Sequence, residues 1–246
     1  ASDYRLVVTN MDDLTGVVYA TTQRYSESEA ASTAPIGQMN NNSVLIQLDN
    51  RDQEGVALAG ISYGQAWFAA VSASELGQAS SNSLLIKNSA LKSEANGQRL
   101  LFAAVSTDRV KNATGQSGSK VASTGVLDNN LTILDNVSLQ REPGSNTRVD
   151  IGAVINVDRS NLGSWLSDAQ MNGNQLFIMN GSDLDADLVF AVFDHNSDYR
   201  TRSDAASNLI YVSDSKVSLG GLFRSWPTEA PIVATAYGTD SAVENT

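Results

Sequence analysis

The sequence predicts an all-β fold of two tandem, duplicated β-sandwich units of the jelly-roll type, each with one short helix. Three observations support this class. Short β-branched and apolar runs alternate with turn residues along most of the chain. Only two segments have the spacing of an amphipathic helix. One ordered set of motifs occurs twice, which indicates a duplication.

The duplicated motif is a pair of apolar runs bounded by asparagine. The first copy comprises residues 82–88 and 99–106, and the second comprises residues 174–180 and 187–194. The copies lie about 90 residues apart, with small differences that fall in polar connections. The simpler alternative is that any two β-rich halves of this composition look alike. A true duplication would place Phe102 on Phe190 and Leu84 on Leu176, with all four side chains inward.

The strands follow from β-branched and aromatic runs that end at Asn, Asp, Gly or Ser. They are expected at residues 4–9, 15–22, 43–48, 56–62, 82–88, 99–106, 130–134, 149–154, 174–180, 187–194, 208–212, 217–223 and 231–237. Residues 26–42 form a predicted surface arm, and residues 111–123 a Gly- and Ser-rich connection.

One helix is expected in each unit. Residues 65–76 place apolar side chains on one side and end before Gly77, a residue that commonly stops helices. In the second unit Leu162, Trp165 and Leu166 begin an i, i+3, i+4, i+7 pattern that ends at Ala169, with Ser160 as N-cap. The predicted units are residues 1–130, with the N-terminal strands and arm, and residues 131–246.

Composition narrows the classes of function. The chain has 246 residues, enough to bury a core without disulfides, and it contains no Cys, which argues against thiol catalysis and Cys-based metal sites. Its net charge of −11 repels phosphate backbones, so direct nucleic-acid binding is not expected. No run is long enough for a membrane span. The weakly charged, Ser- and Asn-rich surface is typical of extracellular or virion β-proteins. The chain starts at Ala1, after either a cleaved leader or a removed initiator Met.

A serine hydrolase is one possible interpretation. Residues 60–64 match the G-x-S-x-G pattern with Ser62 as nucleophile, and the only histidine, His195, lies downstream of Asp183 and Asp187. Against this, an α/β-hydrolase needs a parallel sheet with helices on both faces. With 18 Gly and many Ser in the chain, a chance match is the simpler explanation.

An acidic segment offers hard oxygen ligands. Asp183, Asp185 and Asp187 alternate along a predicted strand, and Asp194 and Asp198 bound the following loop. An exposed acidic edge that discourages wrong strand pairing is the simpler interpretation. The alternative is a calcium site of the non-EF-hand type that uses all five carboxylates. No other cofactor is expected.

Aromatic side chains can stack on sugars. Trp67 and Trp165 lie on amphipathic segments, which favours core packing, whereas Trp226 lies in a polar segment and is the candidate binding residue. A cluster of Arg99, Arg109 and nearby lysines is interpreted as a solvated face rather than an anion site.

These observations favour a non-enzymatic structural subunit of a virion or an extracellular filament that assembles with copies of itself. The first alternative is a secreted carbohydrate-binding or adhesive module. The second is a serine hydrolase that uses Ser62.

Overall fold

The structure is a computed structural model, and strands are its main elements. It describes residues 3–9, 13–15, 17–22, 38–59, 65–73, 78–93, 99–106, 126–158, 169–196, 203–219, 232–233 and 241–243. Within these residues every regular element is a strand, no helix occurs, and all strand pairs are parallel.

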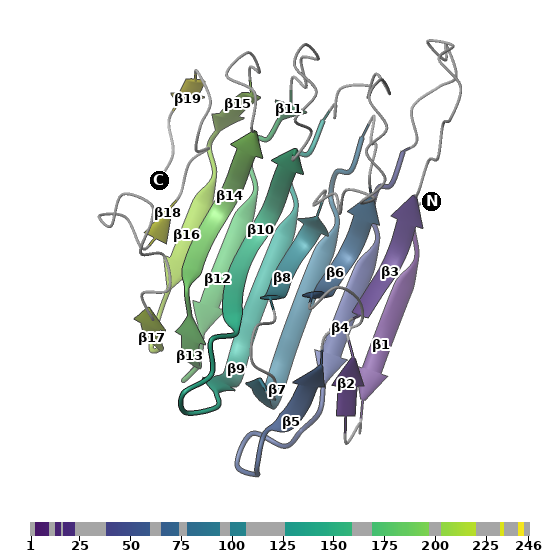
Figure 1. Cartoon of the computed structure of the whole chain (residues 1–246). Coiled ribbons are helices and arrows are strands. Elements are labelled where there is room, and N and C mark those ends of the chain that lie inside the picture. The colour runs from purple at the N-terminus through teal and green to yellow at the C-terminus, as the bar shows by residue number, and fades with distance from the viewer. Residues whose placement is uncertain are drawn as a thin grey trace, which may run out of the picture.

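The strands lie in two main layers (Figure 1). The first layer contains, in spatial order, β1 (Arg5–Thr9), β4 (Ser43–Gln47), β7 (Ser83–Ser93), β9 (Leu131–Arg141), β12 (Gln175–Met179) and β16 (Leu209–Val212). The second layer contains β3 (Val17–Thr22), β6 (Gln65–Ala73), β8 (Arg99–Ser106), β10 (Arg148–Asp158), β14 (Leu188–Asn196) and β18 (Ile232–Val233). In each coil the chain runs along a strand of the first layer and returns along a strand of the second. The strands of the two layers therefore run in opposite directions.

Shorter strands close the two ends of the layers. At the turn from the first layer to the second lie β2 (Asp13–Thr15), β5 (Val56–Ala59), β13 (Asp183–Ala186) and β17 (Lys216–Leu219), beside the second halves of β7 and β9. At the opposite end β11 (Ala169–Gln170), β15 (Ser203–Ala206) and β19 (Ser241–Val243) form a small sheet. Each strand pairs with its counterpart in the next coil, so the architecture is a parallel β-solenoid.

A ladder of buried asparagines marks the start of each coil. Its members, the asparagine ladder, are Asn42, Asn82, Asn130, Asn174 and Asn208. In each step the Oδ1 atom of one asparagine accepts a hydrogen bond from the backbone N–H of the previous one, at 2.9–3.0 Å. Buried polar groups need such partners, and the stacked asparagines supply one to each ladder backbone N–H from Asn42 to Asn174.

The backbone bends sharply before and after each first-layer strand. Residues with positive φ occupy both bends, and for most side chains that conformation is unfavourable. The residues directly before the ladder are Asn41, Ser81, Asn129, Gly173 and Ser207. Those at the second bend are Asp49, Asn180 and Asp214, which follow β4, β12 and β16, and Asn88 and Asn136, which lie within β7 and β9. Asn, Asp and Gly tolerate this region best, which explains the asparagine boundaries of the apolar runs.

The main core lies between the layers. Alternate residues of each first-layer strand point inward, so Val44 and Ile46 of β4 are buried while Ser43 and Gln47 are partly exposed. From the second layer Phe68 and further side chains close the core, and the Phe68 ring stacks on a neighbouring ring with centroids 4.7 Å apart. The hydroxyl of the buried Thr132 has a partner in this apolar environment, because its Oγ1 accepts a hydrogen bond from the Ala104 backbone N–H at 3.0 Å.

The predicted jelly-roll sandwich is wrong. Jelly rolls are antiparallel, whereas here successive coils pair in parallel. The expectation of a virion capsid protein, which drew on this fold as well as on the weakly charged surface, is withdrawn with the jelly roll. The first layer continues across the boundary predicted at residues 130 and 131, since β9 pairs with β7 and with β12. The division into units 1–130 and 131–246 itself stays a prediction.

The predicted helix at residues 65–76 is also wrong, because Gln65–Ala73 forms β6. Its apolar run reflects a second layer that is buried on both sides, so the run lacks the alternation of a half-exposed strand. The second expected helix, residues 160–169, lies outside the described residues except for Ala169, which begins β11.

The repeat is about half as long as expected. Neighbouring ladder asparagines are 40, 48, 44 and 34 residues apart, so Asn82 and Asn174 are separated by two coils. Leu84 and Leu176 do share one register, since both pair with Thr132, and both are buried in the main core.

Phe102 and Phe190 do not share a register. Phe102 pairs with Ile151, which pairs with Val189, so Phe190 is displaced by one position. A one-residue displacement in a strand turns the side chain to the other face. Phe102 packs between the layers, whereas Phe190 is buried on the outer side of the second layer.

Candidate functional site

The outer side of the first layer carries an unbroken row of apolar side chains. The members of this row, the outer stripe, are Val7, Leu45, Leu85, Ile133, Phe177 and Tyr211. Each member pairs in register with the next one, so the stripe crosses all the first-layer strands from β1 to β16.

The stripe follows from the alternation that also builds the core. Inward positions fill the space between the layers, so outward positions of these strands face away from it. Val7 is 48% exposed and Tyr211 is 47% exposed, and the four members between them are partly exposed. The rings of Phe177 and Tyr211 lie 5.7 Å apart, in a tilted arrangement.

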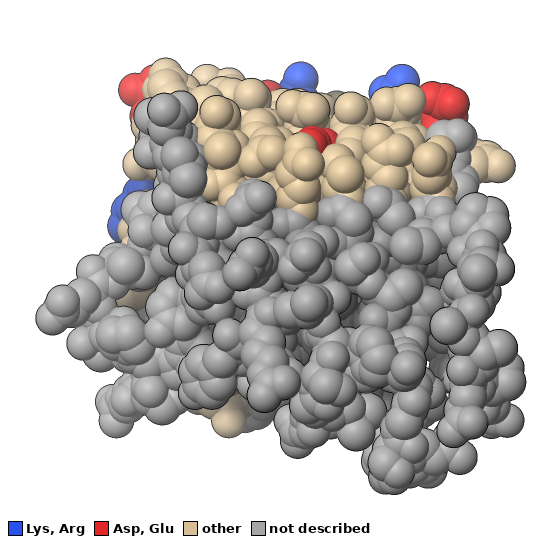
Figure 2. All heavy atoms as spheres, turned by 90° about the horizontal axis from the view of Figure 1, so that it is seen from above, with Lys and Arg blue, Asp and Glu red and all other residues tan. Residues whose placement is uncertain are grey.

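Two rows of mainly polar side chains flank the stripe. On one side lie Arg5, Ser43, Ser83, Leu131, Gln175 and Leu209, and on the other lie Thr9, Gln47, Lys87, Asp135 and Met179. Among these rows only Arg5, Lys87 and Asp135 carry a charge, although the whole chain has a net charge of −11. Figure 2 shows the molecule from above, at one end of the strands, where most described atoms belong to uncharged residues and a few Lys, Arg, Asp and Glu atoms lie among them. The face is therefore apolar in its centre and nearly neutral.

Sequence reasoning missed the stripe. Its members are separated by whole coils, and each lies within an apolar run of its own strand, as Leu45 does between the buried Val44 and Ile46, so the sequence does not distinguish it from the core. The signal that reveals it is the asparagine-bounded motif itself, because the third residue after each ladder asparagine is apolar, as at Leu45, Leu85 and Ile133. Only the correct repeat length places these positions in one row.

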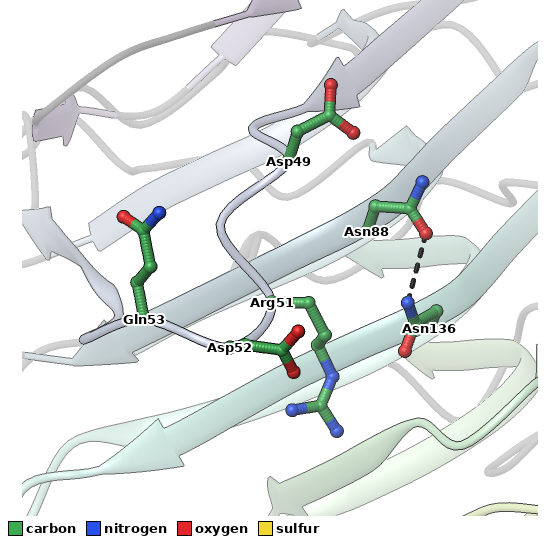
Figure 3. Close-up of a pocket in the computed structure, with 6 residues that line it drawn as sticks. All are labelled: Asp49, Arg51, Asp52, Gln53, Asn88 and Asn136. Atoms are coloured by element: carbon green, nitrogen blue, oxygen red, sulfur yellow. Dashed lines mark hydrogen bonds between the residues drawn. The ribbon is translucent and has the colours of Figure 1, made fainter.

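A polar cleft lies at the turn beyond the first layer (Figure 3). It has a volume of about 300 Å³ and is lined by Asp49, Arg51, Asp52, Gln53, Asn88 and Asn136. The residues 49–53 come from the loop between β4 and β5, and the two asparagines come from β7 and β9.

Contacts across several coils shape this cleft. The Asn136 side chain donates to Asn88 Oδ1 at 3.0 Å, and Arg51 Nη2 donates to the Gly181 carbonyl at 3.0 Å. The Arg51 contact holds the loop between β4 and β5 against the solenoid, and the Asn136 contact joins β9 to β7. The amides, carboxylates and guanidinium of the cleft suit a polar ligand that exchanges hydrogen bonds, and the lining includes no aromatic platform.

The first three carboxylates of the predicted calcium site have cationic partners. Lys216 Nζ lies 3.4 Å from Asp183 Oδ1. Arg141 contacts both Asp185 and Asp187, and its Nη1 lies 2.9 Å from Asp187 Oδ1. The strand alternation expected for this segment is present, since Leu184 and Ala186 are buried between these carboxylates.

Asp187 is the most enclosed of these acids. Burial raises the pKa of its carboxyl above the ordinary value, and hydrogen bonds from the Val149 backbone N–H and from Arg141 oppose this effect. The Val149 N–H to Asp187 Oδ2 distance is 2.7 Å. These contacts join β9, β10 and the bend between β13 and β14, which is a structural role.

The remaining predicted site residues are only partly described. Asp194 lies on β14, paired with Asn156 of β10, and nothing is described of its side chain. Asp198, Trp226 and Ser62 lie outside the described residues. In the described part of the chain no three His, Asp or Glu side chains are grouped to hold a metal ion. The calcium site stays a prediction.

Arg99 belongs to a buried ion network. Its Nε donates to Asp150 Oδ2 at 2.8 Å, and Arg148 Nε donates to Asp150 Oδ1 of the same carboxylate at 2.8 Å. The Asp150 side chain is fully buried. Arg99 therefore neutralises an internal carboxylate, and Arg109 lies outside the described residues.

Comparisons with protein-family models, curated proteins and solved structures give no match. Among the described residues no helix has the length and apolar character to cross a membrane. The surfaces of the solenoid therefore remain as the guide to function.

Proposed function

We propose that the chain is a non-enzymatic structural subunit that associates with copies of itself through the outer face of its first layer. The observation that carries the proposal is the outer stripe. The largest contiguous apolar patch on a protein surface is often functional, and the outer stripe is a contiguous apolar row. The two flanking rows supply the polar rim that such interfaces have.

The size of the face sets the expected strength of association. Six strands spaced about 4.8 Å apart and five residues long give a face of roughly 24 by 17 Å, or about 400 Å² in each copy. Two such faces bury about 800 Å², below the size typical of stable complexes. We therefore expect a weak, reversible contact that becomes effective where many copies are held together.

The test is sedimentation velocity over a wide concentration range. The wild-type protein should show reversible, concentration-dependent association. Ile133→Lys should abolish it, because association would bury an ammonium group at the centre of the stripe. Gln140→Lys is the matched control, since Gln140 is an exposed residue of the same strand, β9, beyond the bend. A wild-type protein that remains monomeric at millimolar concentration would refute the proposal.

A carbohydrate-binding or adhesive module is the second candidate. Phe177 and Tyr211 favour it, because they place two partly exposed rings side by side at one end of the stripe. Calorimetric titration with oligosaccharides, compared between wild type and Phe177→Ala, distinguishes this function from self-association. A serine hydrolase that uses Ser62 would be labelled at that residue by a fluorophosphonate probe, and we expect no labelling.

A further inference from the structure

The outer stripe changes in size along its length. It begins with the small side chain of Val7, passes through Leu45, and ends with the rings of Phe177 and Tyr211. Leu85 and Ile133, which have similar volumes, occupy its centre. A surface of this kind fits its own copy best when the small end of one copy meets the large end of the other.

Two opposite charges lie beside the centre of the stripe. Lys87 and Asp135 occupy neighbouring strands, β7 and β9, and pair directly in register. Asp135 Oδ1 accepts a hydrogen bond from the Asn180 side chain at 2.7 Å. Among the described residues no salt bridge involves Lys87. This ammonium group lies on a nearly neutral face and is available to an acidic partner.

We propose that a second copy docks on the outer stripe with its coil order reversed, so that Lys87 of each copy faces Asp135 of the other. This inference rests on the proposed function and specifies how the partner is placed. The two-fold axis lies parallel to the strands and passes between β7 and β9. In this arrangement Val7 faces Tyr211, Leu45 faces Phe177, and Leu85 faces Ile133 of the partner copy.

The other two-fold arrangement fits less well. If the axis ran along the solenoid, each stripe residue would face itself, so Phe177 would meet Phe177 and Val7 would meet Val7. Lys87 would then face Ser83, and Asp135 would face Leu131, in the opposite flanking row. Charges covered without a partner oppose association. Reversal of the coil order avoids this cost for Lys87 and Asp135.

The charges and the stripe have separate roles in this interface. Burial of the apolar side chains supplies the affinity. The alternating charges, two from each copy, select the register, because like charges placed opposite one another oppose association. Charge reversal should therefore change which chains associate with one another.

The experiment uses two charge-reversal variants, Lys87→Glu and Asp135→Lys. Alone, each variant places like charges opposite one another twice, and its association should weaken at least about tenfold. In a mixture of the two, the glutamate introduced in one chain meets the lysine introduced in the other, and the unchanged Asp135 meets the unchanged Lys87. Association should then return to within about threefold of wild type. Fluorophores on a Cys introduced at Gln140 report mixed complexes by energy transfer, because the chain contains no Cys.

A double variant tests whether the single variants associate weakly only because they are misfolded. The chain that carries both changes, Lys87→Glu with Asp135→Lys, should associate with itself like wild type. It should associate poorly with the wild-type chain, because both charge pairs of that mixed complex have like sign. If wild type associates but the single variants do so equally well, or their mixture shows no recovery, the reversed arrangement is overturned while the proposed self-association stands. If wild type does not associate at all, the proposed function itself fails.

Discussion

Each asparagine of the ladder stabilises the start of its coil. Asn130 Oδ1 accepts from both the backbone N–H and the side chain of Asn82, and its own side chain donates to the Ala79 carbonyl at 2.9 Å. Removal of the amide leaves several buried polar groups without partners. Such groups are costly because water cannot reach them.

Asn130→Ala should lower the free energy of unfolding by about 3 kcal/mol, since each orphaned buried group costs about 1–3 kcal/mol. Urea unfolding monitored by circular dichroism measures this loss. Ser138→Ala, at a partly exposed position of β9, the strand that follows Asn130, is the control and should change the free energy by less than about 0.5 kcal/mol. Equal losses in both variants would contradict a special role for the ladder.

The asparagines could be located from the sequence only in part. The sequence identifies Asn82, Asn88, Asn174 and Asn180 as boundaries, and Asn tolerates the positive φ of a sharp bend. It does not assign Asn130 to the same repeat. Ladder bonding makes Asn specific at these positions, and only the stacked coils reveal it.

Strand positions are more predictable than strand partners. The pattern of β-branched and apolar runs that end at turn residues predicts strands at residues 43–48 and 174–180, and β4 and β12 confirm them. Partners depend on a comparison between coils that differ in length, so the spacing of 34–48 residues hides the period. In the second layer β8, β10 and β14 lie where strands were predicted, whereas β6 was mistaken for a helix, because burial on both sides removes the alternation that identifies a strand.

The packing of β10 against β14 depends on one glycine. A Cβ atom built on Gly152 would lie 1.9 Å from Phe190 Cε2, so the ring occupies the space that any larger residue would need. Phe190 is itself fully buried, within the cluster on the outer side of the second layer. The two residues are therefore coupled.

A double-mutant cycle tests this coupling. Gly152→Ala should cost about 1–3 kcal/mol in the wild-type background, because overpacking displaces the ring. Phe190→Ala should cost about 3–5 kcal/mol through lost burial and the cavity left behind. In the Phe190→Ala background Gly152→Ala should cost close to nothing, because the clash is absent. Additive losses, measured by denaturant unfolding, would show that the two side chains do not meet.

At the scale of the whole molecule, the solenoid turns six ordinary strands into one continuous apolar row. The candidate site could not be predicted from the sequence, since Leu45, Leu85 and Ile133 become neighbours only through parallel register. At the predicted calcium residues the sequence instead suggests a site that the contacts between strands account for differently. Their spacing suggests a metal site, but Asp183, Asp185 and Asp187 contact cations of neighbouring strands.

If the outer stripe is a surface of self-association, its side chains become less accessible to solvent as copies associate. Leu85→Cys places a single thiol at the centre of the stripe in a chain without native Cys, and Gln140→Cys places one on the same sheet beyond the bend. The rate of maleimide labelling is measured for each variant as the protein concentration rises. We predict that labelling at position 85 slows with concentration while labelling at position 140 stays constant. A labelling rate at position 85 that does not change with concentration would contradict the account.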